Sequence, residues 1–138
     1  MNRLQYYILA DTQYNIQSPF LFDLYTNVVK ARLGRDILKR EQISRHDVPA
    51  QMQYKLSDHY RATIVTSPPS LLKDTHSVLV MPDGSFIAIV IKPHRNKASE
   101  QSWNALFKEH EITLSVDFFD IGLLFTSVKL SKQHFILR

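Results

Sequence analysis

Residues 103–138 read WNALFKEHEITLSVDFFDIGLLFTSVKLSKQHFILR, and this stretch decides the fold that we expect. In residues 103–110 the large side chains are three, four and seven residues apart, the spacing of one helical face. Residues 112–118 alternate between apolar and polar, as in a strand with one buried and one wet face. Residues 121–125 are almost wholly apolar, as in a strand covered on both faces, and 134–137 can form a last short strand. The stretch predicts a helix that leads into an antiparallel pair at the end of a sheet.

The N-terminal part of the chain predicts helices and then a loop. Ser18 and Pro19 suit a helix start, an apolar stripe follows to about Leu33, and Gly34 is a candidate C-cap. A second helical piece fits residues 35–43. Residues 44–61 are polar and weakly patterned, so we expect a connecting loop there.

The middle of the chain predicts a β-hairpin. Residues 77–81 and 86–91 are strand-like, and Pro82, Asp83 and Gly84 between them are typical turn residues. A further strand is expected at 62–66, a helical turn at 70–74, and a helix capped by Asn96 or Ser99 after the hairpin. We therefore expect a single α/β or α+β domain over 1–138, with about six strands in a mixed sheet and two or three helices. Its parts are helical (1–43), connecting (44–61) and sheet-forming (62–138).

The composition excludes several classes of function. The chain has no cysteine, which excludes disulfides, thiolate zinc sites and cysteine nucleophiles. Its six histidines show no short metal-binding spacing, so we expect no metal site. No stretch reaches the roughly 18 apolar residues of a membrane helix, and the N-terminus lacks a signal-peptide pattern, so we expect a cytoplasmic protein without a membrane partner. The formal net charge is +4, and its cations fall in separate regions, which favours solvated surface.

Two patches resemble a known family. Residues 113–125, TLSVDFFDIGLLF, with the Trp-x-x-Leu before them and Lys-Gln-His-Phe after them, resemble the C-terminal end of class I S-adenosylmethionine (SAM)-dependent methyltransferase-like proteins. The resemblance continues upstream through His94, Lys97 and Glu100, and residues 18–25 look like that family's N-terminal helix. It implies a shortened methyltransferase core that ends in an antiparallel β-hairpin.

The resemblance also implies a cofactor site, and its residues are missing. Class I methyltransferases hold SAM with a glycine-rich turn between a strand and a helix, where the backbone approaches the ligand closely. The chain has three glycines (Gly34, Gly84 and Gly122), and none follows a strand and opens a helix. Tyr14 and Gln17 replace the family's histidines, and Ile91 and Lys92 replace an acidic pair. We therefore expect no cofactor, no catalytic residue and a non-catalytic role in binding or assembly. The alternative is an active methyltransferase whose SAM site is divergent or supplied by a partner.

A second alternative is a basic module that binds anions or nucleic acid. Its candidate residues are Lys92, His94, Arg95 and Lys97, in a loop that leads into a helix N-terminus. We expect a small anion there rather than nucleic acid, because the aromatic residues lie in runs that look buried. Asp117 and Asp120 are expected to be exposed beside a turn. The expected partner is a second copy or another protein, because a shortened sheet leaves an unpaired edge.

Overall fold

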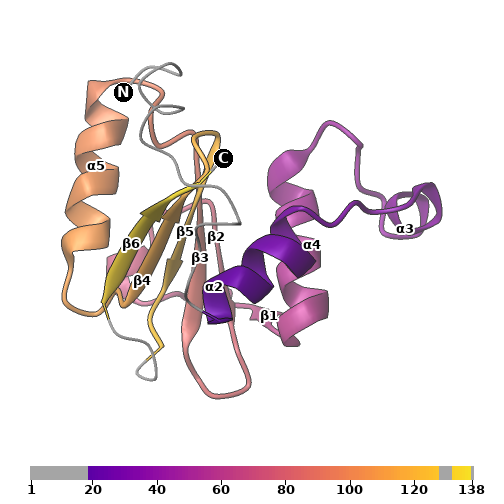
Figure 1. The fold of residues 1–138 in the computed structure, drawn as a ribbon, viewed down its shortest axis with the longest axis horizontal. Coiled ribbons are helices and arrows are strands. Elements are labelled where there is room, and N and C mark those ends of the chain that lie inside the picture. Colours follow the sequence, from indigo (N-terminus) through magenta and orange to yellow (C-terminus); the bar gives the residue numbers. More distant parts are fainter. Residues whose placement is uncertain (1–18, 128–131, 138) are drawn as a thin grey trace.

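The computed structural model describes residues 19–127 and 132–137 and has a mixed α/β fold in three layers. A six-stranded sheet lies between α5 on one face and α2, η2 and α4 on the other (Figure 1). The helical elements are α2 (Pro19–Asp23), the π-helix η2 (Leu24–Val29), α3 (Arg35–Arg40), α4 (Val48–Tyr60), the 3₁₀-helix η3 (Ser70–Leu72) and α5 (Lys97–Lys108). The strands are β1 (Thr63–Ile64), β2 (Ser77–Val80), β3 (Phe86–Ile91), β4 (Leu114–Asp117), β5 (Ile121–Phe125) and β6 (Gln133–Ile136). The described part thus has four α-helices, more than the two or three expected.

The sheet has the order β1-β2-β3-β5-β4-β6 and is antiparallel except for the β4–β6 pair, which is parallel. The predicted hairpin is confirmed: the Met81 N–H donates to Ser85 O at 2.8 Å, and Gly84 takes the left-handed φ of +89° that the turn requires. The expected antiparallel pair of β4 and β5 is also present, and β6 adds a strand beyond it.

The expected loop at 44–61 is wrong, because α4 occupies most of it. The Asp47 side chain caps this helix by accepting the Ala50 N–H at 3.1 Å, and Pro49 lies in its first turn. Only Met52 and Leu56, one turn apart, are fully buried, and they pack against the sheet. Because so narrow an apolar stripe is surrounded by polar residues, the sequence pattern looks like a loop.

The N-terminal helix ends at Val29, earlier than the expected Leu33. The Lys55 Nζ of α4 donates to Val29 O at 3.2 Å and to Ala31 O at 3.1 Å, which satisfies carbonyl groups at and just beyond the helix end. Burial lowers the pKa of Lys55. Gly34 is not a C-cap; it precedes α3 with φ −69° in extended backbone. The expected helix start at Ser18 lies outside the described residues.

On the other face, α5 packs so closely on the sheet that β5 needs a glycine. The Trp103 side chain is 1% exposed, and a Cβ at position 122 would lie 2.5 Å from two atoms of its indole ring. The sequence predicts a turn or bulge marked by Asp120 and Gly122, but Gly122 lies inside β5, where it admits the indole. Because α5 covers one face of the sheet and α2, η2 and α4 cover the other, β4 is buried on both faces, whereas the sequence pattern predicts a wet face.

The last strand is fastened to the end of α5 by one lysine. Lys132 Nζ donates to the carbonyl oxygens of Phe107, Glu109 and Ile112 at 3.1, 2.7 and 2.8 Å. These carbonyls lie at and beyond the C-terminus of α5, where a cation is favoured by the helix dipole. Most of the expected polar connection at 129–133 lies outside the described residues. Within 19–127 and 132–137 no helix combines the length and apolar character that crossing a bilayer requires.

Candidate functional site

The structure separates the four predicted anion-binding residues. Lys92 and Arg95 are exposed on the connection between β3 and α5, and Lys97 is exposed at the first position of α5. Only 5% of the His94 side chain is exposed. Asn96 caps α5, as predicted, by accepting the Ser99 N–H at 2.9 Å. The helix start thus already has an acceptor of its own. The anion site stays a prediction that rests on the three exposed cations.

His94 instead lies at the centre of a buried charge cluster. Its Nδ1 is 2.8 Å from Glu100 Oε2, in the first turn of α5, and its Nε2 is 2.5 Å from Asp117 Oδ2, at the end of β4. The Asp117 side chain is 2% exposed and that of Glu100 is 26% exposed. Both contacts are hydrogen bonds when both ring nitrogens are protonated, or when one carboxyl group carries the proton. The cluster ties the first turn of α5 to the sheet.

Two bends with positive φ hold this cluster in place. Phe119 has φ +72°, its N–H donates to Asp117 Oδ1 at 2.8 Å, and its ring stacks on His94 at 5.4 Å between centroids. Lys92, with φ +45°, donates its N–H to Asp120 O at 2.8 Å. Residues other than glycine rarely adopt positive φ angles, and they do so where surrounding contacts enforce the backbone conformation. The two bends close the sheet end around His94.

A second polar pair lies two residues before Asp117 on β4. Ser115 Oγ is 2.6 Å from His134 Nδ1 of β6, and the His134 ring stacks on Phe107 of α5 at 3.9 Å between centroids. Burial lowers the pKa of His134, and His94 lowers it further, while the charge of Asp117 acts in the opposite direction. A buried serine beside a histidine resembles part of a nucleophilic dyad, but Ser115 is only 1% exposed. The buried hydroxyl is therefore not open to a substrate in this structure.

Two hollows border β3, one beside α5 and one just beyond its C-terminal end. One, of about 490 Å³, is lined by Trp103, Val90, Pro93 and Asp74, among others, and the other, of about 430 Å³, lies at the far end of the helix. Leu71 borders both hollows, and neither is lined by His94, Asp117 or Ser115. The Trp103 Nε1 atom is buried without a hydrogen-bond partner. The accessible space beside α5 is therefore separate from the buried charge cluster.

The connection between β3 and α5 does not fit SAM. Such a cofactor needs backbone free of side chains between a strand and a helix, and residues 92–96, KPHRN, contain no glycine. Pro93 is buried and His94 is directed into the protein. Within the described ranges, no group of three or more His, Cys, Asp or Glu residues is arranged to hold a metal ion. Tyr14 and Gln17, which replace the family's histidines, lie outside the described residues.

The sequence pattern missed most of this cluster. Asp117 is buried, contrary to the expected exposure, because it belongs to the strand that α5 covers; Asp120 is exposed as expected. The sequence pattern did not identify Glu100, Ser115 or His134 as hydrogen-bonding partners. The available signal was the row of polar residues 113, 115 and 117 on a strand next to an amphipathic helix. Comparisons with family models, with curated proteins and with solved structures gave no significant match, so the methyltransferase-like resemblance stays a prediction from the residues.

Proposed function

We propose that this chain is a non-catalytic, methyltransferase-like module that acts by assembly, pairing with a second copy of itself through the edge strand β1. Loss of catalysis is supported by the connection between β3 and α5. Its helix start is capped by Asn96, and its histidine is enclosed by two carboxylates. His94 and the two carboxylates are engaged with one another, and His94 and Asp117 are shielded from solvent.

The observation that carries the assembly proposal is the edge of the sheet at β1. Among the described strands, β1 pairs only with β2. Ile64 is 59% exposed, the largest exposed fraction among the large hydrophobic residues that the structure describes. An unpaired, apolar edge is a template for pairing with another chain.

The register of β1 shows which backbone groups are available for such pairing. The Val65 N–H donates to Val78 O at 2.9 Å, and Ile64 lies opposite Leu79. Because bonded and non-bonded pairs alternate along an antiparallel ladder, the N–H and C=O of Ile64 face away from β2. Two copies related by a twofold axis at Ile64 would pair these groups reciprocally.

A two-residue strand is too short to form the whole interface. A stable interface buries about 800 Å² on each partner. Beside Ile64 lies a hollow of about 270 Å³, lined also by Ile43, Ala50 and Tyr54. The hollow adjoins the exposed isoleucine, so a second copy would cover both together.

Mass in solution tests the assembly proposal. Light scattering coupled to size-exclusion chromatography, with the protein loaded at about 100 μM, should give the mass of a dimer. Ile64→Lys should give a monomer, because the substitution places two ammonium groups face to face at the twofold axis. Val48→Lys is the matched control: Val48 is 51% exposed and lines a different hollow, so this variant should stay dimeric. A monomeric wild type, or equal loss of the dimer in both variants, contradicts the proposal.

A further inference from the structure

One segment carries the whole excess of positive charge of this chain. Residues 30–46, here called the basic arm, contain six cations and two carboxylates and so have a net charge of +4. The cations are Lys30, Arg32, Arg35, Lys39, Arg40 and Arg45, and the carboxylates are Asp36 and Glu41. The chain as a whole also has a net charge of +4, so the remaining residues sum to zero.

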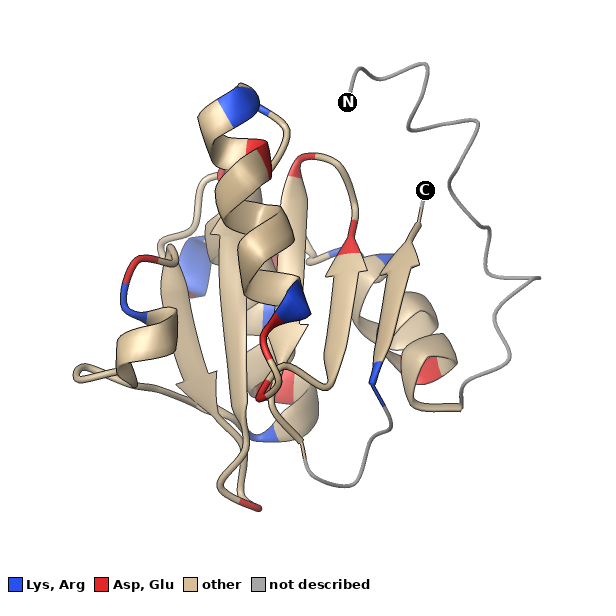
Figure 2. Ribbon diagram, turned by 90° about the vertical axis from the view of Figure 1, so that its left-hand side faces the viewer, with Lys and Arg blue, Asp and Glu red and all other residues tan. Residues whose placement is uncertain are grey.

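The arm extends away from the rest of the molecule. In Figure 1, α3 lies at the end of the molecule opposite α5, beyond α4. None of the residues of α3 is buried, and all six cations are exposed. Within the described ranges, the one ion pair of these cations joins Arg40 to Glu41 at 3.2 Å. On the α5 side, by contrast, basic and acidic positions are interspersed (Figure 2).

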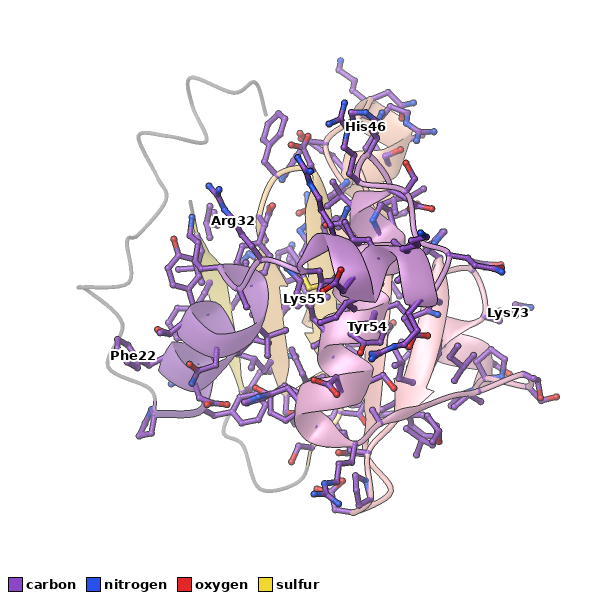
Figure 3. The ribbon with its side chains drawn as sticks, turned by 90° about the vertical axis from the view of Figure 1, so that its right-hand side faces the viewer. Phe22, Arg32, His46, Tyr54, Lys55 and Lys73 are labelled. Atoms are coloured by element: carbon purple, nitrogen blue, oxygen red, sulfur yellow. The ribbon has the colours of Figure 1, made fainter. Side chains whose placement is uncertain are left out.

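The arm is nevertheless held in a defined shape. The Ile43 N–H donates to Leu38 O at 2.9 Å at the end of α3, and Gln51 of α4 donates to Ser44 O at 3.0 Å. Arg40 Nη2 donates to the hydroxyl of Tyr54 at 3.1 Å. Figure 3 views this side and labels Tyr54 together with Arg32 and His46 of the arm. The cations are thus presented on ordered backbone.

We propose that the basic arm binds the phosphate backbone of a nucleic acid. Four of its six cations are arginines, whose planar guanidinium groups bind phosphate oxygens through paired hydrogen bonds. Backbone contacts of this kind need no aromatic platform, so the buried aromatics of the sheet do not count against them. The proposal does not rest on assembly through β1, although Glu41 and Ile43 of the arm line the hollow beside Ile64.

An anionic membrane fits the arm less well than a nucleic acid does. Peripheral helices insert an exposed apolar face between lipid headgroups. The large apolar residues of the arm are half-buried, and none is among the exposed large hydrophobics of the described part. They are Leu33, Ile37, Leu38 and Ile43. The arm therefore offers charge without an insertable surface.

Fluorescence anisotropy with labelled 20-nucleotide single-stranded and duplex DNA tests the proposal. If the arm neutralises about four phosphates of a duplex, affinity should fall roughly 100-fold between 50 and 200 mM salt. If neither the single-stranded nor the duplex DNA binds at 50 mM salt, the proposal is overturned. An affinity that does not change with salt concentration overturns it as well. Binding to phosphatidylserine vesicles without binding to DNA overturns it in favour of a membrane.

Matched charge reversals locate the site. Arg35→Glu with Lys39→Glu changes two exposed cations of the arm, and Arg95→Glu with Lys97→Glu changes two exposed cations at the start of α5. The first variant should lose at least tenfold in affinity, and the second should stay within threefold of wild type. Equal losses, or a larger loss in the second, overturn the proposal. If circular dichroism shows that the first variant is unfolded, Arg32→Gln with Arg45→Gln, outside α3, must show the loss instead.

Discussion

Replacing Gly122 by alanine should force Trp103 away from the sheet. The new Cβ would lie 2.5 Å from both Cη2 and Cζ3 of the indole and 3.1 Å from Cζ2, closer than real Cβ contacts. Neither side can yield easily. Gly122 is on β5, paired with Val90 on one neighbouring strand and Asp117 on the other, and Trp103 is 1% exposed.

The size of the effect follows from two opposing terms. Overpacking a well-packed core costs about 1–3 kcal/mol, and a clash with a ring on a central strand belongs at the upper end. Removing a glycine from a strand returns about 0.5–1 kcal/mol of backbone entropy. The net loss of unfolding free energy should be about 2 kcal/mol, which lowers the urea midpoint by about 1 M.

Urea unfolding followed by circular dichroism measures this loss, and a double-mutant cycle identifies its cause. Trp103 is the only tryptophan of the chain, so its fluorescence also reports the displacement in Gly122→Ala. Trp103→Phe removes most of the clashing ring, so Gly122→Ala should cost less in that background, with a coupling energy of about 1–2 kcal/mol. Equal costs in both backgrounds, or a stabilised single variant, would refute the close approach of α5 to β5.

Three further predictions concern the cap of α5 and the residues near the C-terminus of the chain that contact this helix. Asn96→Ala should destabilise the protein by about 1 kcal/mol, because the Ser99 N–H loses its acceptor; Asn96→Asp should retain stability in the same urea assay. Lys132→Met should cost about 1–2 kcal/mol, because three carbonyls at and beyond the C-terminus of α5 lose a charged donor, and Lys132→Arg should cost less. Because burial lowers the pKa of His134, the unfolded chain binds its proton at a higher pH than the folded chain does, so stability should fall as pH drops below about 6.5. His134→Asn should reduce that fall between pH 8 and pH 5, and an unchanged pH dependence contradicts the assignment.

Regular local patterns explain which parts of the fold were predictable. The hairpin of β2 and β3 follows from turn residues whose chemistry is local, and the start of α5 follows from the cap Asn96. β5 is recognisable because a strand covered on both faces is apolar throughout. Each of these features depends on neighbours along the chain.

The missed features depend on partners distant in sequence. α4 buries only two side chains fully, so its periodicity is weak, and its helical state depends on packing against the sheet. Asp117 is acceptable in the core because His94, 23 residues earlier, lies against it. Gly122 resembles a turn residue until Trp103 is seen to occupy the space of its missing side chain. Sequence spacing does not reveal such pairings.

Titration of the full chain with SAM in a calorimeter distinguishes a chain that has lost cofactor-dependent catalysis from an active methyltransferase. We expect no binding heat up to millimolar SAM, because the turn before α5 presents side chains and a capped helix where the cofactor needs bare backbone. One-to-one binding at micromolar SAM would contradict it and favour an active methyltransferase with a divergent site.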